Sequence, residues 1–166
     1  MPSDTVSRDT TLPPDAEARA LARALLHEAR HAALSYLDAA TGLPGISRIA
    51  FGTDPAGLPT TFVSALAPHA PGLRTHPDCA VMVGDPGSKG DPLNAPRLML
   101  RARAGFVGPA DSDHAALRAK WLSDHPKSKL YIDFADFAFV RLTPVSVLLN
   151  GGFARAYRLT IDDLGL

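Results

Sequence analysis

The stretch GISRIAFGTDPAGLPTTFVSAL, residues 45–66, decides the fold class. Its two apolar runs, residues 45–52 and 60–66, flank the segment TDPAGLP, whose Asp, Pro and Gly residues favour a turn. Short apolar runs joined by such a turn predict a β-hairpin. The fold class therefore depends on whether the rest of the chain supplies more strands.

More strands are expected on the C-terminal side of this hairpin. Four further runs are apolar or alternate between apolar and polar residues: CAVMVGD (79–85), RLMLRARAGFV (97–107), FAFVRL (137–142) and VSVLLNGGF (145–153). AYRLTI (156–161) is a candidate last strand, and PGSKGDPLNAP (86–96) is too rich in Gly, Pro and Asp for anything but a loop. Many short strands with turn signals predict a mainly β protein, a small barrel with helices packed outside.

The N-terminal half begins with a helical segment whose end is ambiguous. Residues 15–34 are rich in Ala, Leu and Arg with helical spacing, and Asp15 is the expected N-cap. Helix propensity alone would extend this helix to Ala40, where Gly42 would cap it. Residues 32–42, however, also alternate as a strand does.

A second helix is expected over residues 111–124. Its sequence DSDHAALRAKWLSD is capped near Asp111 or Ser112 and stops before Pro126. Trp121 lies beside Leu117 and Leu122 in this segment, which favours a place in the core over stacking on a cofactor.

Length and composition restrict the function classes. At 166 residues with zero formal net charge, the chain has a single-domain length and no Lys/Arg run that would contact a phosphate backbone. The single cysteine, Cys79, cannot form an internal disulfide, which fits a reducing compartment. No apolar run approaches the ~20 residues of a membrane span, and polar residues 1–14 resemble a disordered tail rather than a secretion signal. We therefore expect a cytoplasmic protein with one domain over residues 15–166 and no nucleic-acid or membrane partner.

Residues 27–31, HEARH, match the H-E-x-x-H pattern of zinc peptidases, in which two His on one helix face bind zinc. The only Glu residues are Glu17 and Glu28, so no Glu follows the pattern as third ligand. The longer form HExxHxxGxxH is absent as well, although an Asp remains an alternative ligand. We interpret the match as coincidental, on an amphipathic helix whose polar residues face solvent or a partner subunit, and predict no metal site.

A stronger signal is spread over the chain from about Arg19 to the end. Four elements occur in the order SALAPHAPGL (64–73), GDPLNAPRL (90–98), DFAFVRL (136–142) and GGFARA (151–156). In this order the sequence resembles the pyridoxamine 5′-phosphate oxidase-like, FMN-binding split-barrel superfamily, and most of all its haem-utilisation branch. The resemblance implies a split β-barrel of six or seven strands, whose first strand covers roughly Ala32 to Leu37.

The resemblance also implies a set of FMN-binding residues. Arg48 would bind the phosphate, since a dianion needs Arg or Lys together with hydroxyl or backbone donors. Ile49 and Ala50 would lie along the flavin ring, with Val63 and Ser64 on the adjacent strand. His69 occupies the position where many oxidases of the superfamily place a phosphate-binding Lys, and Arg97 would lie near the polar edge of the ring. The alternatives are a salt-bridge role for each Arg, a strand hydroxyl for Ser64 and a turn cap for His69.

Several departures from the family pattern narrow the expected function. Ala70 and Gly72 replace a Thr and an Asn of the pattern. The tail AYRLTIDDLGL offers Arg158 but no Trp, which disfavours vitamin B6 oxidation. Haem-degrading members bind iron through a C-terminal His, whereas no His follows His125 here, which argues against haem oxygenase activity.

The leading expectation is an FMN-dependent oxidoreductase that acts on a small-molecule substrate, with no catalytic residue identified. The alternatives are a haem- or tetrapyrrole-binding protein without turnover and a non-catalytic dimeric binding protein. The resemblance further implies a homodimer, because superfamily members form the cofactor site between two subunits.

Overall fold

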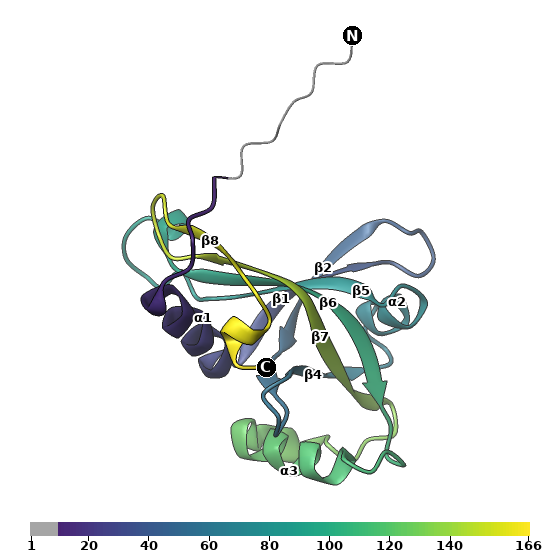
Figure 1. Ribbon diagram of the computed structural model, residues 1–166. Coiled ribbons are helices and arrows are strands. Elements are labelled where there is room, and N and C mark those ends of the chain that lie inside the picture. Colours follow the sequence, from purple (N-terminus) through teal and green to yellow (C-terminus); the bar gives the residue numbers. More distant parts are fainter. Residues whose placement is uncertain (1–9) are drawn as a thin grey trace.

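The computed structural model describes residues 10–166 as an antiparallel eight-stranded sheet with three α-helices and three 3-10 helices (Figure 1). The elements are, in chain order, α1 (Ala16–Glu28), β1 (His31–Leu37), β2 (Pro44–Ala50), β3 (Gly52–Thr53), β4 (Pro59–Ser64), α2 (His69–Thr75), β5 (Asp78–Val83), η1 (Pro92–Asn94), β6 (Arg97–Val107), α3 (His114–Asp124), η2 (Pro126–Leu130), β7 (Phe137–Asn150), β8 (Ala156–Leu159) and η3 (Asp162–Leu164). The mainly β class predicted from the sequence is confirmed.

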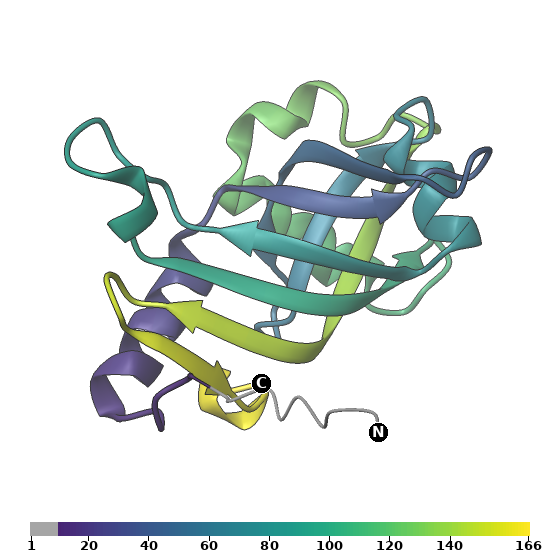
Figure 2. The same cartoon turned by 90° about the horizontal axis from the view of Figure 1, so that it is seen from above.

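The strands form one curled sheet in the order β2-β1-β5-β6-β7-β4-β3, with β8 paired to β7. The long strands β6 and β7 form the middle of the sheet, and the whole sheet bends into an open half-barrel (Figure 2). Helix α1 packs on its concave side, where Ala18, Ala22 and Leu26 join the main core. Helix α3 packs on the opposite side, at the ends of β4, β6 and β7, against Phe62, Val107 and Phe139. The split-barrel prediction is therefore confirmed, although the sheet has eight strands rather than the expected six or seven, because the short β3 forms a strand of its own. Within residues 10–166, no helix covers the convex side over β1 and β5 (Figure 1).

Helix α1 ends earlier than propensity suggests. Asp15 caps it as predicted, its Oδ1 accepting a hydrogen bond from the backbone N of Ala18 at 2.7 Å. Ala18, Ala22 and Leu26 are buried against the sheet. The helix stops at Glu28 and the chain becomes extended, so the extension to Ala40 is wrong and the family-based strand is confirmed.

This helix end separates the two histidines of the H-E-x-x-H match. His27 lies in the last turn of α1, whereas His31 is the first residue of β1. The two side chains therefore do not share a helix face, as the zinc peptidase pattern requires. Among residues 10–166, no group of three or more His, Cys, Asp or Glu side chains is arranged to hold a metal ion.

The hairpin predicted over residues 45–66 is formed differently from the simple expectation. Residues 45–52 do not make one strand, because the chain changes partners at the fully buried Phe51. Strand β2 pairs with β1, while the short β3 pairs with β4 through Gly52↔Thr60 and Thr53↔Pro59. Burial of Phe51 thus breaks the run in two and closes the corner of the barrel.

Helix α3 begins at His114 rather than at the predicted residues 111 or 112. Asp111 instead accepts a hydrogen bond from the backbone N of Gly108 at 2.6 Å in the preceding turn. The core position predicted for Trp121 is confirmed, since only 1% of the residue is exposed. Its Nε1 donates to the hydroxyl of Ser128 at 3.1 Å, which satisfies the indole inside the core.

The N-terminal boundary differs from the expected one. Of the predicted disordered tail, residues 1–9 lie outside the described part of the chain. Leu12 bridges Tyr157 of β8, and its backbone N donates to the carbonyl of Ala156 at 2.7 Å. The paired part of the chain therefore begins before Asp15. None of the helices in residues 10–166 is both long and apolar enough to span a bilayer.

Candidate functional site

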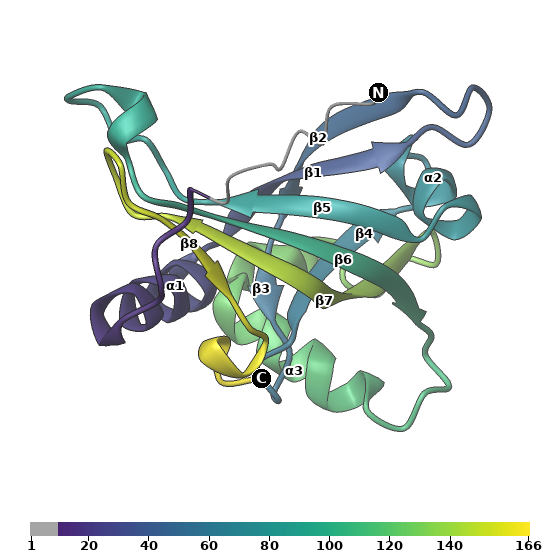
Figure 3. The same cartoon turned by 45° about the horizontal axis from the view of Figure 1, so that its top comes forward.

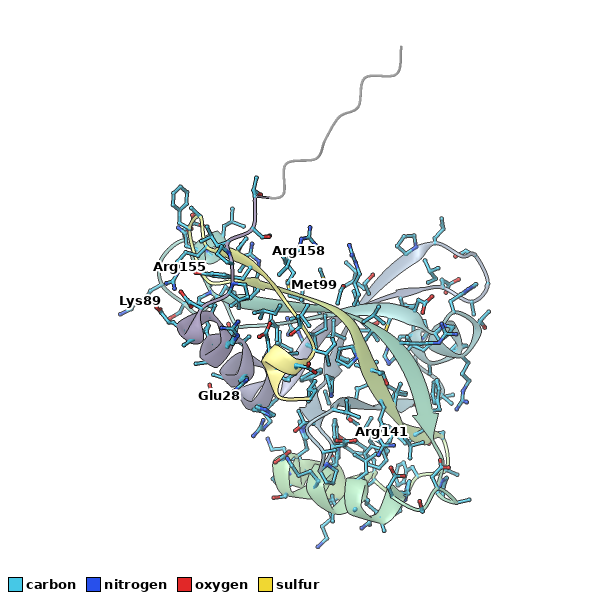
Figure 4. All side chains as sticks on the ribbon, in the orientation of Figure 1. Glu28, Lys89, Met99, Arg141, Arg155 and Arg158 are labelled. Atoms are coloured by element: carbon cyan, nitrogen blue, oxygen red, sulfur yellow. The ribbon has the colours of Figure 1, made fainter. Side chains whose placement is uncertain are left out.

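The convex face of the sheet carries a continuous row of side chains across six strands. Direct pairing places the row in the order Arg48 (β2), Ala33 (β1), Met82 (β5), Met99 (β6), Leu148 (β7) and Arg158 (β8). Directly opposed residues point to the same side of a sheet, so all six face away from the core. Figure 4 shows Met99 and Arg158 on this upper side, away from Glu28 at the end of α1.

Helix α3 packs on the far end of this face, at Val107 and Phe139. No helix of residues 10–166 lies over the part of the face that carries the row, which we call the open face (Figure 3). Its middle carries the apolar side chains of Met82, Met99 and Leu148, and Met82 is 43% exposed. Ile46 in the edge strand β2 is 78% exposed. Arginines surround that apolar middle: Arg48 in β2, Arg97 and Arg101 on either side of Met99, and Arg158 in β8. The open face thus combines an apolar centre with positive charge at its margins.

A cleft of about 600 Å³ lies at the β2–β1–β5 end of the open face. It is lined by His31, Ala32, Ala33, Ile46, Ser47, Arg48, Met82, Gly84, Asp85 and Pro86. We call it the Arg48 cleft. Within residues 10–166 the Arg48 guanidinium makes no hydrogen bond or ion pair, so it is available to an anionic ligand.

A smaller cleft of about 240 Å³ adjoins the Arg48 cleft and shares Met82, Gly84 and Pro86 with it. Arg97 lines this second cleft, and its Nη1 donates to the carbonyls of Leu93 at 2.9 Å and Ala95 at 3.3 Å. Those bonds fix the guanidinium against the loop that precedes β6. Arg97 therefore borders the same part of the open face as Arg48.

Gly84 allows this loop to approach the sheet. Its φ is +119°, and a Cβ atom there would lie 2.5 Å from the carbonyl oxygen of Pro96. Only glycine accommodates both the backbone conformation and the close approach. The shape of both clefts therefore depends on a residue without a side chain.

Of the residues expected along the flavin ring, Ile49 and Ala50 lie in β2 at the edge of the open face, whereas Val63 lies in β4, outside it. Ile49 and Val63 are core residues, 5% and 3% exposed, so only their backbone groups are available to a ligand. Ala50 is half-buried and pairs with His31 at the edge of the Arg48 cleft. Strand β4 is not paired with β2, so the expectation that these strands are adjacent in the sheet is wrong. The ring-binding role of the three residues stays a prediction.

Ser64 and His69 are not brought into the Arg48 cleft. The Ser64 hydroxyl donates to Oδ2 of Asp136 at 2.8 Å and accepts from the backbone N of Leu66, so it already has protein partners. His69 lies at the start of α2, where its ring packs edge-on against Tyr36 at 6.0 Å. Burial lowers the pKa of His69, which keeps the ring neutral near pH 7 and poorly suited to bind a phosphate dianion.

Two residues of the Arg48 cleft were not among the cofactor-binding residues expected from the sequence. His31 and Met82 line the Arg48 cleft although they lie 51 positions apart in the chain. The alternation within residues 31–37 contains the signal for His31, because burial of Leu34 and Tyr36 points His31 and Ala33 to the other face. The strand order that brings Met82 beside them is not a local property.

Comparison with known proteins places these features among haem-related relatives. The chain is 33% identical over 116 residues to the chloroplastic heme oxygenase HOZ from Arabidopsis thaliana, covering 70% of this chain and 34% of that protein. A solved heme binding protein from Mycobacterium smegmatis is 28% identical, with a TM-score of 0.79, over 93% of this chain and 61% of that one. The chain thus spans about a third of the curated relative it matches.

More distant structures show the fold alone. The heme storage protein HutZ from Vibrio cholerae has a TM-score of 0.70 at 19% identity, over 85% of this chain and 97% of that one. A putative pyridoxamine 5′-phosphate oxidase from Listeria innocua has a TM-score of 0.58 at 16% identity, over 78% and 94%. No protein-family model matches the chain.

Proposed function

Because the chain belongs to the pyridoxamine 5′-phosphate oxidase-like split-barrel superfamily, where its relatives include proteins of the haem-utilisation branch, we propose that it binds haem on the open face. The observation that carries the proposal is the Arg48 cleft, which joins an unpaired guanidinium to an apolar floor. Binding is the function proposed here, rather than a particular turnover.

The residues of the cleft fit the chemistry of haem. Haem is a flat apolar macrocycle with two carboxylates at one edge, and it needs an apolar surface beside a positive group. Ala33, Ile46 and Met82 supply the apolar surface, and Arg48 supplies the charge for a propionate. The volume of about 600 Å³ falls in the range of roughly 300–1,000 Å³ that small-molecule and cofactor sites occupy.

The proposed site is completed by a second copy of the chain. Unlike a buried cofactor site, the Arg48 cleft opens to solvent along a sheet face whose apolar residues include Met82, Met99 and Leu148. Burying that face against its own copy would remove apolar surface from water and cover the cleft. A two-fold dimer does this with one self-complementary surface.

The test is a haem titration of the purified protein followed by visible absorption. Arg48→Ala should weaken binding by about 1.5–3 kcal/mol, the typical contribution of a hydrogen bond to a charged group. The matched control is Arg103→Ala, because Arg103 is an exposed arginine of β6 that pairs with Asp78 and lines no part of the cleft. Absence of haem binding by the wild type, or equal losses in both variants, would contradict the proposal.

FMN is the second candidate, because the unpaired guanidinium of Arg48 suits a phosphate as well as a propionate. On this alternative the protein is a flavin-dependent oxidoreductase for a small molecule, as the family resemblance implies. Arg48→Ala should then weaken FMN more than Ser64→Ala does, and should leave riboflavin, which lacks the phosphate, unaffected. A protein that binds neither chromophore would be a non-catalytic binding protein.

A further inference from the structure

We infer that His31 is the axial iron ligand of haem bound in the Arg48 cleft; this inference rests on the proposed function. The observation behind it is that His31 lines the same cleft as Arg48 while its imidazole has no protein partner within residues 10–166. A neutral imidazole is the most frequent protein ligand of haem iron.

The strand register places His31 correctly for this role. His31 is the first residue of β1 and pairs with Ala50, while Ala33 pairs with Arg48. His31 and Arg48 are therefore diagonal neighbours on adjacent strands, and both face the same side of the sheet. The typical distance between the Cα atoms of such a pair is roughly 7–8 Å. In a haem-loaded cleft, His31 would therefore hold the iron and Arg48 would hold a propionate of the same macrocycle.

The other five histidines are placed elsewhere, and none of them lines the Arg48 cleft. His125 stacks on Trp121 and bonds the carbonyl of Phe51 with its Nε2 at 3.0 Å. His69 packs against Tyr36, and His114 packs edge-on against Phe139 at 5.6 Å.

His27 and His76 lie at helix ends away from the cleft. His27 belongs to the last turn of α1, near Gly57 in the turn between β3 and β4. His76 is the C-cap of α2. Of the six histidines, only His31 both lines the Arg48 cleft and has a ring without a hydrogen bond or ring contact within residues 10–166.

A carboxylate in the same cleft is placed to orient the His31 ring. Asp85 lines the Arg48 cleft and also the adjoining cleft of about 320 Å³ behind it, and His31 lines both. Oδ1 of Asp85 accepts from the backbone N of Gly87 at 3.0 Å, which leaves Oδ2 for a further donor. Metal-ligating histidines usually donate their second ring N–H to such a group, which fixes the ring and raises its basicity.

The experiment compares haem-loaded wild type, His31→Ala and His27→Ala by absorption and resonance Raman spectroscopy. We expect an iron–imidazole stretching band in the ferrous wild type and in His27→Ala, and its loss in His31→Ala. His31→Gly with added imidazole should restore the band and the wild-type Soret position. Both histidines are exposed, so the substitutions should preserve the fold.

The possible outcomes separate this inference from the proposed function. If the wild type binds no haem, both fail. If haem binds and the iron–imidazole band persists in His31→Ala, the ligand is another residue and only the inference fails. If Met82→Leu rather than His31→Ala alters the spectrum, the ligand is the thioether and the inference fails as well. Loss of the iron–imidazole band in His31→Ala, with its return in His31→Gly when imidazole is added, supports the assignment of His31 as the iron ligand.

Discussion

Met82 in β5 and Met99 in β6 lie directly opposite each other and place their side chains on the open face of the sheet. A charge at this point would be buried unpaired if a second copy covers the face. We therefore expect Met99→Asp to convert the proposed dimer into a monomer that still unfolds cooperatively. Sedimentation equilibrium at micromolar concentration measures this change.

The control for the dimer prediction is Leu130→Asp. Leu130 is 81% exposed and lies in η2, which contacts α3 rather than the strands that carry Met82 and Met99. This variant should remain dimeric. A wild type that sediments as a monomer would refute the shared site, and dissociation in Leu130→Asp alone would place the interface elsewhere.

Arg141 connects the middle of the sheet to the turn between β3 and β4. Its Nε donates to Oδ2 of Asp54 at 2.8 Å, and its Nη2 bonds Asp113. The Asp54 side chain is 3% exposed, and its other oxygen accepts from the backbone N of Ala56 and Leu58. Arg141→Ala leaves this carboxylate buried without its cation, so we expect a loss of about 3 kcal/mol in the free energy of unfolding, measured with urea.

An exposed ion pair provides the comparison for Arg141. Arg103 and Asp78 are 65% and 81% exposed, and Arg103→Ala should cost less than about 1 kcal/mol. Similar losses in the two variants would mean that burial does not decide the contribution of these pairs.

Gly72 replaces an Asn of the family pattern, and the structure supplies a reason. A Cβ at Gly72 would lie 2.6 Å from the carbonyl oxygen of Leu37 and 2.8 Å from Cδ2 of Tyr36. Gly72→Ala should therefore destabilise the protein by about 1–3 kcal/mol through overpacking. Gly105→Ala is the control, because a Cβ at Gly105 meets nothing within 4 Å. If thermal unfolding shows equal stability for the two variants, α2 is less tightly held against β1 than the structure indicates.

Stability should fall on mild acidification because of two half-buried imidazoles, those of His69 and His125. Burial lowers the pKa of both His69 and His125 below the ordinary value of 6.5. The folded state then binds protons more weakly than the unfolded chain, so the free energy of unfolding decreases as the pH falls below about 6.5. The loss continues until the pH passes the folded-state pKa values.

Urea titrations between pH 7.5 and pH 4.5 measure this effect, and the double substitution His69→Gln/His125→Gln should flatten the profile over that window. Carboxylates change the free energy of unfolding over a separate, more acidic pH range. A hydrogen bond from Arg19 lowers the pKa of Asp163 to about 2, so its contribution is lost only in stronger acid. A wild-type stability that is constant from pH 7.5 to 4.5 would contradict the assignment to the histidines.

The sequence by itself determined the local elements. Alternation and turn residues located β5 and β6, since these signals depend on neighbouring residues alone. They divided β7 wrongly into two runs, 137–142 and 145–153, because the continuous strand passes through Pro144 by pairing with β6. Asp15 marked the start of α1, and the ordered motifs from residue 64 onward indicated the split barrel. These predictions succeeded because a strand or an N-cap is specified within a few residues of itself.

Only the tertiary structure decided where those elements meet. The end of α1 at Glu28 and the break at Phe51 follow from burial against distant strands, which overrides local propensity. Sequence neighbours such as Val63 and Ser64 have different environments, because one side chain faces the core and the other bonds Asp136.

The cleft itself depends on the order of strands. Arg48, His31 and Met82 meet because β1 lies between β2 and β5, an arrangement that buries Leu34, Ile49 and Val81 together on the concave side. A one-residue slip in any of these strands would turn its whole apolar set outward, so burial fixes the register. Residues 48 and 82 become neighbours through that long-range constraint, which no local pattern in the sequence contains.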